Sequence, residues 1–368
     1  MKKALVHDWY YVNGGAEKVI RSINSMWDDF EHYALTDFLT NSDRDYILNG
    51  ANVHTSFIQK LPTAKSNHRK FLQLFPYGIE QFDLSEFELV ISSSSSIAKG
   101  VLTHQDQLHI CYCHSPMRYA WDLYHDYLKS ANLNKGLKGI YAKYVLNKIR
   151  AWDIISSNRV DHFVANSNYI AERIHKVYRR ESEVIYPPVD VSFFEFQKEK
   201  DEFYFTASRM VPYKNTKQIV QAFNEIPNKK LVVAGDGPEL EKIKKIAKPN
   251  IEFVGFISND ELKSYLKNAK AFVFAALEDF GIVPVEAQAC GTPVICLGKG
   301  GTKETVINEK TGVHFKNPVS NEIKEAILYF ESLSFDPELI RENVLKFSKN
   351  NFEKKFKSYV ERKYQDFT

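Results

Sequence analysis

The feature that most constrains the fold is an alternation of short apolar runs with helical patterns, repeated on both sides of a double proline, Pro187-Pro188. Short apolar runs are typical of buried strands, and the segments between them repeat their apolar residues at helical spacing. Buried strands that alternate with helices form parallel, doubly wound sheets. The sequence therefore predicts an α/β protein with one such sheet in each half.

The individual elements can be assigned from these patterns. The predicted strands are Ala4–His7, Glu88–Ile91, Leu108–Cys113, Asp161–Ala165, Phe203–Ala207, Leu231–Ala234, Ile251–Val254, Ala271–Ala275 and Pro293–Cys296. The predicted helices include Tyr169–Val177, Thr216–Asn224, Glu239–Ala247, Asp260–Asn268 and Val283–Cys290, and the tail Glu338–Phe367 is largely helical. Ser167 or Asn168 can cap the first of these helices.

The double proline marks the expected domain junction, because two prolines cannot continue a helix or a central strand. A chain of 368 residues also suits two domains. We predict Rossmann-like domains over residues 1–188 and 189–345, followed by a helix over residues 346–368 that packs back toward the first domain.

Composition narrows the class of protein. The net charge of +3 is too small to indicate a nucleic-acid partner, and none of the four cysteines forms a CxxC pair typical of zinc or redox sites. Cysteines without such spacing fit a reducing cytosol. The first residues lack the apolar core of a signal peptide, and the run Ala271–Leu277 is too short to span a bilayer. We therefore expect a cytoplasmic protein.

Two segments of the first half are basic and contain no acidic residue. They are His54–Tyr77 and Lys129–Arg150. Within the second, apolar side chains follow helical spacing at Leu137, Ile140, Tyr141, Tyr144, Val145, Ile149 and Trp152. Such a stripe either faces a core or lies in a membrane interface, where the basic residues would meet anionic headgroups.

The strongest chemical pattern is Glu278-Asp-Phe-Gly-Ile-Val-Pro-Val-Glu286, which follows a predicted strand and opens a helix. Ligands of open α/β sheets bind at the carboxyl ends of the strands. Gly281 permits close approach of a ligand, and the amides of Ile282 and Val283 are free donors at the helix start. Two acids that merely cap a helix are the alternative interpretation.

Other candidate residues follow other strands. Arg209 and Lys214 flank a proline turn and could together bind a diphosphate, unless the loop is only a basic surface. Gly14-Gly15 opens a helix after the first strand and could turn amides toward an anion, or simply form a tight turn. His114 ends another strand and could bind a sugar hydroxyl, or be structural.

Taken in order, these motifs resemble the retaining GT-B glycosyltransferases of family 4 over essentially the whole chain. The resemblance rests on the Gly14-Gly15 loop, the His114-x-Pro116 strand end, the Arg209 and Lys214 pair, the Gly235-Asp-Gly-Pro238 loop and the Glu278-x7-Glu286 motif. It implies two Rossmann-like domains that face a central cleft, with the acceptor bound by the first. The stretch from His114 to Asp122 is similar to a bacterial branch that often transfers mannose from GDP-mannose.

The resemblance also implies roles for single residues. Arg209 and Lys214 would clamp the donor diphosphate, Glu278 and His114 would meet the donor sugar, and Glu286 would bind the ribose. Further donor contacts would come from Gly14, Gly15, Gly255, Phe256, Ile257, Phe280, Gly281, Ile282 and Val283. The acceptor would be a glycan or lipid-linked glycan, with peripheral membrane contact.

We expect no cofactor and no metal, because Asp43-Arg-Asp45 has no strand end beside it and is interpreted as the cap at a helix start. Retention normally suggests a double displacement, but the family lacks an evident nucleophile, so attack on the same face is favoured. A nucleotide-sugar epimerase of GT-B architecture and a non-catalytic binding protein are the alternatives. A phosphorylase is disfavoured, since no cofactor-lysine motif is evident.

Overall fold

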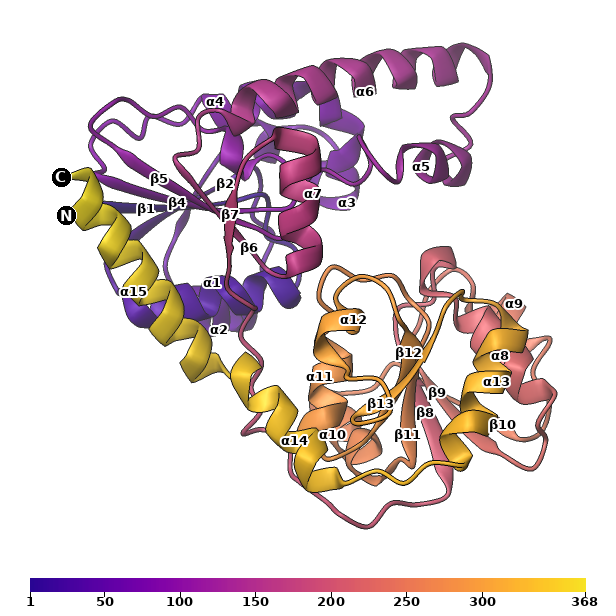
Figure 1. Cartoon of the computed structure of the whole chain (residues 1–368). Coiled ribbons are helices and arrows are strands. Elements are labelled where there is room, and N and C mark those ends of the chain that lie inside the picture. Colours follow the sequence, from indigo (N-terminus) through magenta and orange to yellow (C-terminus); the bar gives the residue numbers. More distant parts are fainter. The chain divides into compact units, whose positions relative to one another are not determined.

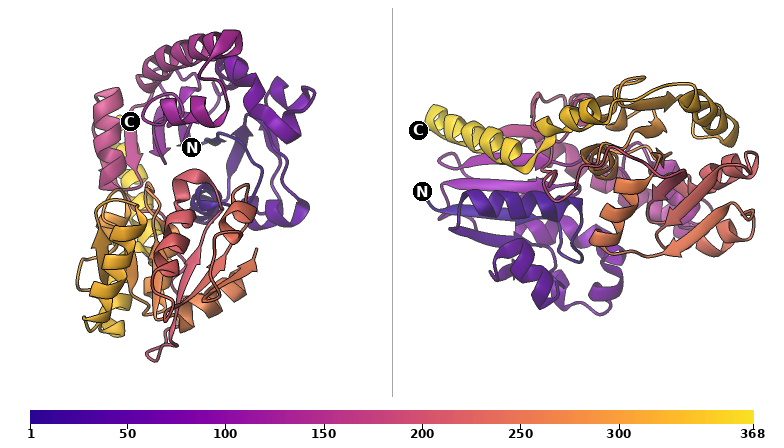
Figure 2. Two further views of the ribbon diagram at one scale, coloured as in Figure 1. Left: turned by 90° about the vertical axis from the view of Figure 1, so that its right-hand side faces the viewer. Right: turned by 90° about the horizontal axis from the view of Figure 1, so that it is seen from below.

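The computed structural model describes residues 1–368, which divide into two compact units. The first unit comprises Met1–Tyr186 and Phe352–Thr368, and the second comprises Pro187–Asn351. Each unit has a parallel sheet covered by helices (Figure 1 and Figure 2). No helix of the structure combines the length and the apolar character needed to cross a membrane.

The first unit contains a seven-stranded sheet in the order β3-β2-β1-β4-β5-β6-β7, with every neighbouring pair parallel. Its strands are β1 (Lys3–His7), β2 (Phe30–Ala34), β3 (Val53–Thr55), β4 (Leu89–Ser94), β5 (Leu108–Cys113), β6 (His162–Ala165) and β7 (Ser182–Val184). Its helices are α1 (Gly15–Met26), α2 (Asn41–Leu48), α3 (Ala64–Asn67), α4 (Phe75–Glu80), α5 (Tyr124–Ser130), α6 (Gly136–Ser157), α7 (Asn168–Tyr178) and most of α15 (Lys349–Phe367), with short 3-10 turns η1 (Phe57–Lys60), η2 (His68–Leu74) and η3 (Ala98–Gly100).

Alternate residues of the strands build a separate core on each face of this sheet. On one face, Leu5 and Ile91 pack with α1, α2 and α15, whose apolar residues include Ile20 and Phe356. On the other face, residues such as Val90 pack with α4, η3 and the C-terminal half of α6. The long charged tail therefore covers the same face as α1, which Figure 1 shows as the yellow helix beside indigo helices.

The second unit contains a six-stranded parallel sheet in the order β10-β9-β8-β11-β12-β13. Its strands are β8 (Phe203–Ala207), β9 (Lys230–Ala234), β10 (Ile251–Gly255), β11 (Ala271–Phe274), β12 (Val294–Leu297) and β13 (Gly312–Phe315). Its helices are α8 (Thr216–Asn224), α9 (Leu240–Lys244), α10 (Asn259–Asn268), α11 (Ile282–Ala289), α12 (Thr302–Thr305), α13 (Ser320–Glu331) and α14 (Pro337–Val344), with 3-10 turns η4 (Pro212–Lys214) and η5 (Leu345–Phe347).

The predicted buried strands are confirmed, two of them to the residue: Leu108–Cys113 and Phe203–Ala207. The cap of α7 is Ser167, whose hydroxyl accepts a hydrogen bond from the amide of Ile170 at 3.1 Å. The prediction for Asp43 was right about the helix start but not about the cap. Thr40 caps α2, and Asp43 lies in its first turn.

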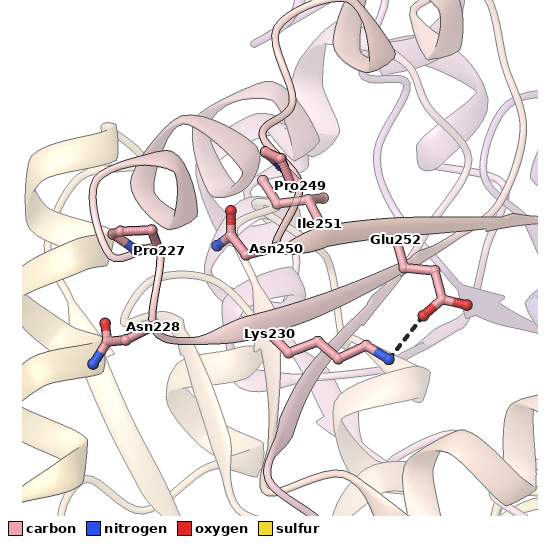
Figure 3. A pocket seen from close by; sticks show the side chains of 7 residues that line it. All are labelled: Pro227, Asn228, Lys230, Pro249, Asn250, Ile251 and Glu252. Atoms are coloured by element: carbon pink, nitrogen blue, oxygen red, sulfur yellow. Dashed lines mark ion pairs between the residues drawn. The ribbon is translucent and has the colours of Figure 1, made fainter.

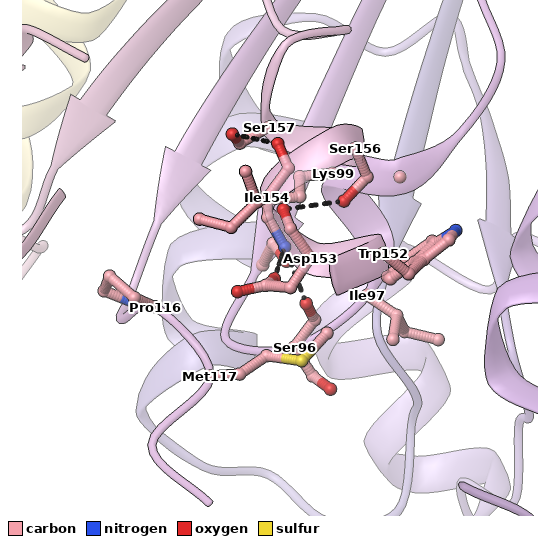
Figure 4. A network of polar contacts seen from close by, with 12 residues as sticks. Ser96, Ile97, Lys99, Pro116, Met117, Trp152, Asp153, Ile154, Ser156 and Ser157 are labelled. Atoms are coloured by element: carbon pink, nitrogen blue, oxygen red, sulfur yellow. Dashed lines mark hydrogen bonds and ion pairs between the residues drawn. The ribbon is translucent and has the colours of Figure 1, made fainter. Parts of the chain in front are cut away.

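The first unit contains a buried ion pair that the sequence did not predict. Lys99 of η3 and Asp153 of α6 are both almost fully buried and bonded to each other (Figure 4). Asp153 also accepts hydrogen bonds from the indole of Trp121 at 2.7 Å and the hydroxyl of Tyr178 at 3.0 Å, and Lys99 donates to the carbonyl of Ser96 at 3.1 Å. Each charge is thus satisfied, and these contacts join α6 and α7 to η3.

We expect Lys99→Met to destabilise the protein by about 3–5 kcal/mol, because the substitution leaves the buried carboxylate of Asp153 without its cation. Lys230→Met is the matched control: its partner Glu252 lies 2.9 Å away, and both side chains are more than half exposed (Figure 3). Its cost should stay within about 1 kcal/mol. Urea denaturation measures both, and equal losses would contradict a structural role for the buried pair.

Candidate functional site

In the second unit, the predicted basic and acidic residues follow the two strands at which the sheet reverses its winding direction. Strand β8 continues to β9 on one side, and β11 continues to β12 on the other, so the chain leaves β8 and β11 in opposite directions. Such a switch point is where open α/β sheets bind ligands. Arg209 and Lys214 follow β8, and Glu278 follows β11.

Lys214 is placed by the short turn η4. Pro212 starts this turn, and Asn215 ends it in a left-handed conformation with φ of 57°. The side-chain amide of Asn215 donates to the backbone carbonyl of Ala275 at 3.0 Å, which fastens the turn to the end of β11. The ammonium of Lys214 lies 5.7 Å from the centre of the Phe274 ring, within the range of a cation–π contact.

Glu278 is the ion-pair partner of Lys214, and both side chains are largely but not fully buried. The loop after β12 holds the backbone of Glu278 in place. The amide of Gly301 donates to the carbonyl of Glu278 at 2.9 Å, and a Cβ on Gly301 would overlap the backbone of Phe280. A cation and a carboxylate are therefore held side by side at the switch point.

Arg209 and the predicted base-binding residues lie at the same edge of the sheet, after β8 and at the end of β10. Arg209 is exposed, and its guanidinium has no hydrogen-bond or ion-pair partner in the structure. Gly255 is the last residue of β10, Phe256 and Ile257 follow it, and Phe256 is 86% exposed. The carbonyl of Gly255 accepts a hydrogen bond from the amide of Gly235 at 2.7 Å, which links the loops after β9 and β10.

Helix α11 carries the remaining residues of the Glu278-x7-Glu286 motif. Gly281 precedes the helix with φ of 85°, and Ile282 and Val283 form its first turn, whose amides have no partner inside the helix. Phe280 and Gly281 are buried, as is Glu286 one turn further on. The helix start therefore adds backbone donors next to Glu278.

In the first unit, the predicted residues again lie around a switch point, here between β1 and β4. Gly14 precedes α1, and its amide donates to the Glu17 carboxylate at 3.0 Å. His114 follows β5. Its backbone is held by the carbonyl of Ser94 at 2.8 Å and by the side chain of Asn166 at 3.0 Å.

A chain of polar side chains connects these two predicted features. Ser93 Oγ lies 2.8 Å from Nε2 of His114 and 3.2 Å from Nδ1 of His7. The other nitrogen of His7 is 3.6 Å from Glu17, whose second oxygen binds Gly14. Gly15, by contrast, opens α1 and has no side chain to join the network.

Burial and pairing set the charges of this network. Burial alone would lower the pKa of His7, but its contact with Glu17, helped by Asp8, keeps that pKa above its ordinary value. Burial likewise opposes the charge on Glu17, but the pairing with His7 keeps the pKa of this carboxyl below its ordinary value. Burial lowers the pKa of His114 to about 4, so this imidazole is neutral near pH 7.

Asp8, the residue after β1, is a buried carboxylate that holds the loop after β4. It accepts hydrogen bonds from the amides of Ser95, Ile97 and Ala98 at 2.6–2.8 Å and from the Ser95 hydroxyl at 2.9 Å. Sequence analysis missed Asp8, His7 and Ser93. The available signal was that an apolar strand ends at an ionisable residue, His7, and that a second one, Asp8, follows directly.

No group of three or more His, Cys, Asp or Glu side chains in residues 1–368 has the geometry of a metal site. All four cysteines are free and buried. The cation, amides and carboxylates described above can bind anions and hydroxyl groups directly.

Models of known protein families match both units of the chain. The model described as "Glycosyltransferase Family 4" matches residues 13–193, and the model "Glycosyl transferases group 1" matches residues 190–351, so the two together cover most of the chain. The chain belongs to the family 4 glycosyltransferases.

Individual family members show more limited similarity. An uncharacterized glycosyltransferase of Methanocaldococcus jannaschii is 30% identical over 195 residues, which cover 51% of this chain and 55% of the relative. A GDP-mannose-dependent α-(1-6)-phosphatidylinositol monomannoside mannosyltransferase of Mycobacterium tuberculosis is 37% identical over 125 residues, 29% of this chain and 32% of the relative. The chain thus spans about half or less of the length of these relatives.

Among solved structures, Anabaena HepE in complex with UDP and glucose aligns over 98% of this chain and 100% of its own, with a TM-score of 0.68 and 16% identity. Such a likeness identifies the fold. Together with the two parallel sheets, it confirms the predicted GT-B architecture of two Rossmann-like domains.

We expect Gly235→Ala to destabilise the second unit more than Gly255→Ala. Both glycines have positive φ, 119° and 73°, so both substitutions strain the backbone by about 1–2 kcal/mol. A Cβ at Gly235 would also overlap the carbonyl of Ser208, at a further cost of about 1–3 kcal/mol, whereas one at Gly255 has open space around it. Thermal and urea unfolding measure the difference, and equal effects would contradict the tight packing of these loops.

Proposed function

We propose that the chain is a retaining glycosyltransferase that moves a hexose from a nucleotide-sugar donor to an acceptor hydroxyl. The observation that carries this proposal is the pairing of Lys214 with Glu278 at the switch point of the second unit. A diphosphate needs a cation, and the sugar attached to it needs hydrogen-bond acceptors for its hydroxyls. Lys214 provides the cation and Glu278 provides the hydrogen-bond acceptor, and the two side chains are in contact.

Departure of the nucleoside diphosphate is the step that the site suits best. Negative charge grows on the diphosphate as the glycosidic bond breaks, and fixed positive groups stabilise that charge. Lys214, Arg209 and the first amides of α11 would act in this way. Cationic side chains would then do what a divalent cation does in other transferases, so we propose a metal-independent reaction.

Retention is proposed to proceed by attack on the face from which the diphosphate leaves, with the leaving phosphate oxygen accepting the proton of the acceptor hydroxyl. Glu278 is already engaged by Lys214, which makes it a poor nucleophile. Isolation of a covalent sugar adduct on Glu278, or on any other side chain, would contradict this mechanism.

Mannose from GDP-mannose is the proposed donor. It is supported by the stretch from His114 to Asp122 and by the mycobacterial relative, whose name specifies GDP-mannose. The HepE structure, whose title names UDP, makes UDP-sugars the competing choice. A thermal-shift panel of GDP, UDP, ADP and their sugars tests this, with the largest stabilisation expected from GDP and GDP-mannose.

The proposed acceptor is a lipid-linked or growing surface glycan, and the support comes from the surface of α6. Its C-terminal half packs into the core through Leu146 and Ile149, but its N-terminal half does not. The apolar side chains of that half are exposed by 55–85%: Leu137, Ile140, Tyr141 and Tyr144. The predicted stripe is therefore core-facing over only part of its length.

The same surface is basic. Lys135, Lys138, Lys143 and Lys148 are exposed on or beside this half of α6. A hydrogen bond between Tyr141 and Gln73 places it next to η2, which adds the exposed Arg69 and Lys70. Apolar side chains surrounded by lysines complement an anionic lipid surface, and we propose peripheral contact with such a membrane there.

We expect Lys214→Ala to weaken binding of the donor and its nucleoside diphosphate by on the order of 2 kcal/mol, about 30-fold in Kd, because a charge-assisted contact is lost. Lys217→Ala, an exposed lysine on neighbouring α8, is the control and should bind normally. Calorimetric titration and steady-state kinetics measure both variants. Unchanged affinity in Lys214→Ala would remove the diphosphate assignment.

Glu286→Gln should raise KM for the donor with little change in kcat, because the proposed ribose contact is made equally in the ground and transition states. A turnover defect at unchanged KM would be inconsistent with ribose binding.

Ile140→Glu should lower partitioning onto phosphatidylglycerol-containing vesicles by about tenfold or more, because it removes buried apolar area and adds a negative charge. Ile155→Glu is the matched control on the same helix, at 59% exposure against 65% for Ile140. Sedimentation with vesicles measures binding, which should weaken at high salt. Equal binding of the two variants, or equal binding to pure phosphatidylcholine, would rule out this surface.

A further inference from the structure

The position of Ser93 in the first unit determines which hydrogen-bonding groups His114 can offer. Ser93 lies on β4 directly opposite His7 of β1 in the parallel ladder, so both side chains project from the same face of the sheet. Ser93 is fully buried, and its hydroxyl lies between two imidazoles, at 3.2 Å from His7 Nδ1 and 2.8 Å from His114 Nε2.

The proton on His7 can be located from geometry alone. Its Nδ1 lies 3.0 Å from the backbone carbonyl oxygen of Ser93. A carbonyl oxygen can only accept a hydrogen bond, so this nitrogen must carry a hydrogen. The Glu17 carboxylate near the other nitrogen stabilises the charged form, in which both nitrogens carry hydrogen.

The direction of the Ser93 hydroxyl follows. Because Nδ1 of His7 is a donor, the Ser93 hydroxyl cannot donate to it. The remaining acceptor within reach is Nε2 of His114. Since a buried hydroxyl hydrogen normally has an acceptor, the hydroxyl of Ser93 donates to that nitrogen, which is then unprotonated. A neutral imidazole that is unprotonated at Nε2 carries its hydrogen on Nδ1.

We propose that Ser93, oriented by His7, fixes His114 as the Nδ1–H tautomer, so that His114 donates a hydrogen bond to an oxygen of the donor sugar and does not act as a base. This inference rests on the proposed function for the identity of the ligand, but the tautomer itself does not depend on it. Ser93, His7 and Glu17 are positioning residues that act through His114.

Two observations agree with this assignment. Nδ1 of His114 has no hydrogen-bond partner in the structure, so its hydrogen is available to a ligand. Burial also keeps the imidazole neutral near pH 7, as its low pKa indicates. Because Glu17 also accepts from the amide of Gly14, the network holds the start of α1 and the end of β5 in one arrangement.

The direct test is the ¹⁵N spectrum of histidine-labelled full-length protein, in which protonated and unprotonated ring nitrogens have distinct shifts. His114→Asn identifies the His114 signals by their loss. We expect a protonated Nδ1 and an unprotonated Nε2 in the unmodified protein. A protonated Nε2 would overturn the proposal, whatever the protein's activity.

Ser93→Ala should allow the Nε2–H tautomer and lower turnover by about two- to tenfold, the effect of one neutral hydrogen bond. Ser93→Thr, which keeps the hydroxyl, should restore the tautomer. The matched control is Ser92→Ala, since Ser92 lies on the same strand and makes an equivalent 2.8 Å bond to His109. An unchanged His114 tautomer in Ser93→Ala, or equal turnover losses in both alanine variants, would overturn the positioning role.

These measurements test the proposed function and the positioning role of Ser93 separately. If the tautomer is as expected but no nucleotide sugar binds, the proposed function fails and the network stands. If donor binds and turns over while His114 carries its hydrogen on Nε2, the proposed function stands and the positioning role fails.

Discussion

The arrangement of the candidate site depends on one constraint, the reversal of winding in each parallel sheet. Where successive connections leave neighbouring strands in opposite directions, the loops separate and expose backbone groups and side chains at the carboxyl edge. In the second unit this occurs between β8 and β11, and in the first between β1 and β4. The lysine and glutamate of the second unit and the histidine–serine network of the first lie at these two points because the topology allows polar groups there.

Close backbone packing then makes the loops of the second unit rigid. The loop after β9 approaches the loop after β8 so closely that only glycine fits at position 235, and the loop after β12 presses on Phe280 in the same way through Gly301. Hydrogen bonds connect the same loops, from Met210 to Asp236 at 2.8 Å and from Gly301 to Glu278 at 2.9 Å. The charged side chains therefore project from a backbone that is already ordered before any ligand binds, which favours binding and catalysis.

The sequence predicted the central strands well because they are buried on both faces and read as continuous apolar runs. It missed β2, β3, β7 and β13, which are short or carry Glu and His side chains, as in Phe30–Ala34. The predicted helix Glu239–Ala247 was too long, since α9 ends at Lys244. The residues after it form tighter turns, in which the amides of Ile246 and Ala247 bond to carbonyls three residues back. Candidate site residues that directly follow a strand could be predicted, because their position depends only on where that strand ends. The contact between His7 and Ser93 could not, because it depends on the register between β1 and β4, which the sequence of neither strand specifies alone.

The two units differ in the kind of group that they present at their switch points. In the second unit, Lys214 shares its charge with a single partly exposed carboxylate, and Arg209 is unpaired, so positive charge is available to an anion. In the first unit, the charges of Asp8, His7 and Glu17 are satisfied internally by amides and by one another, and His114 at the end of the network is a neutral imidazole. Each kind of group suits a different ligand: free positive charge suits an anion, and a neutral imidazole suits a hydroxyl group that can form a hydrogen bond with it.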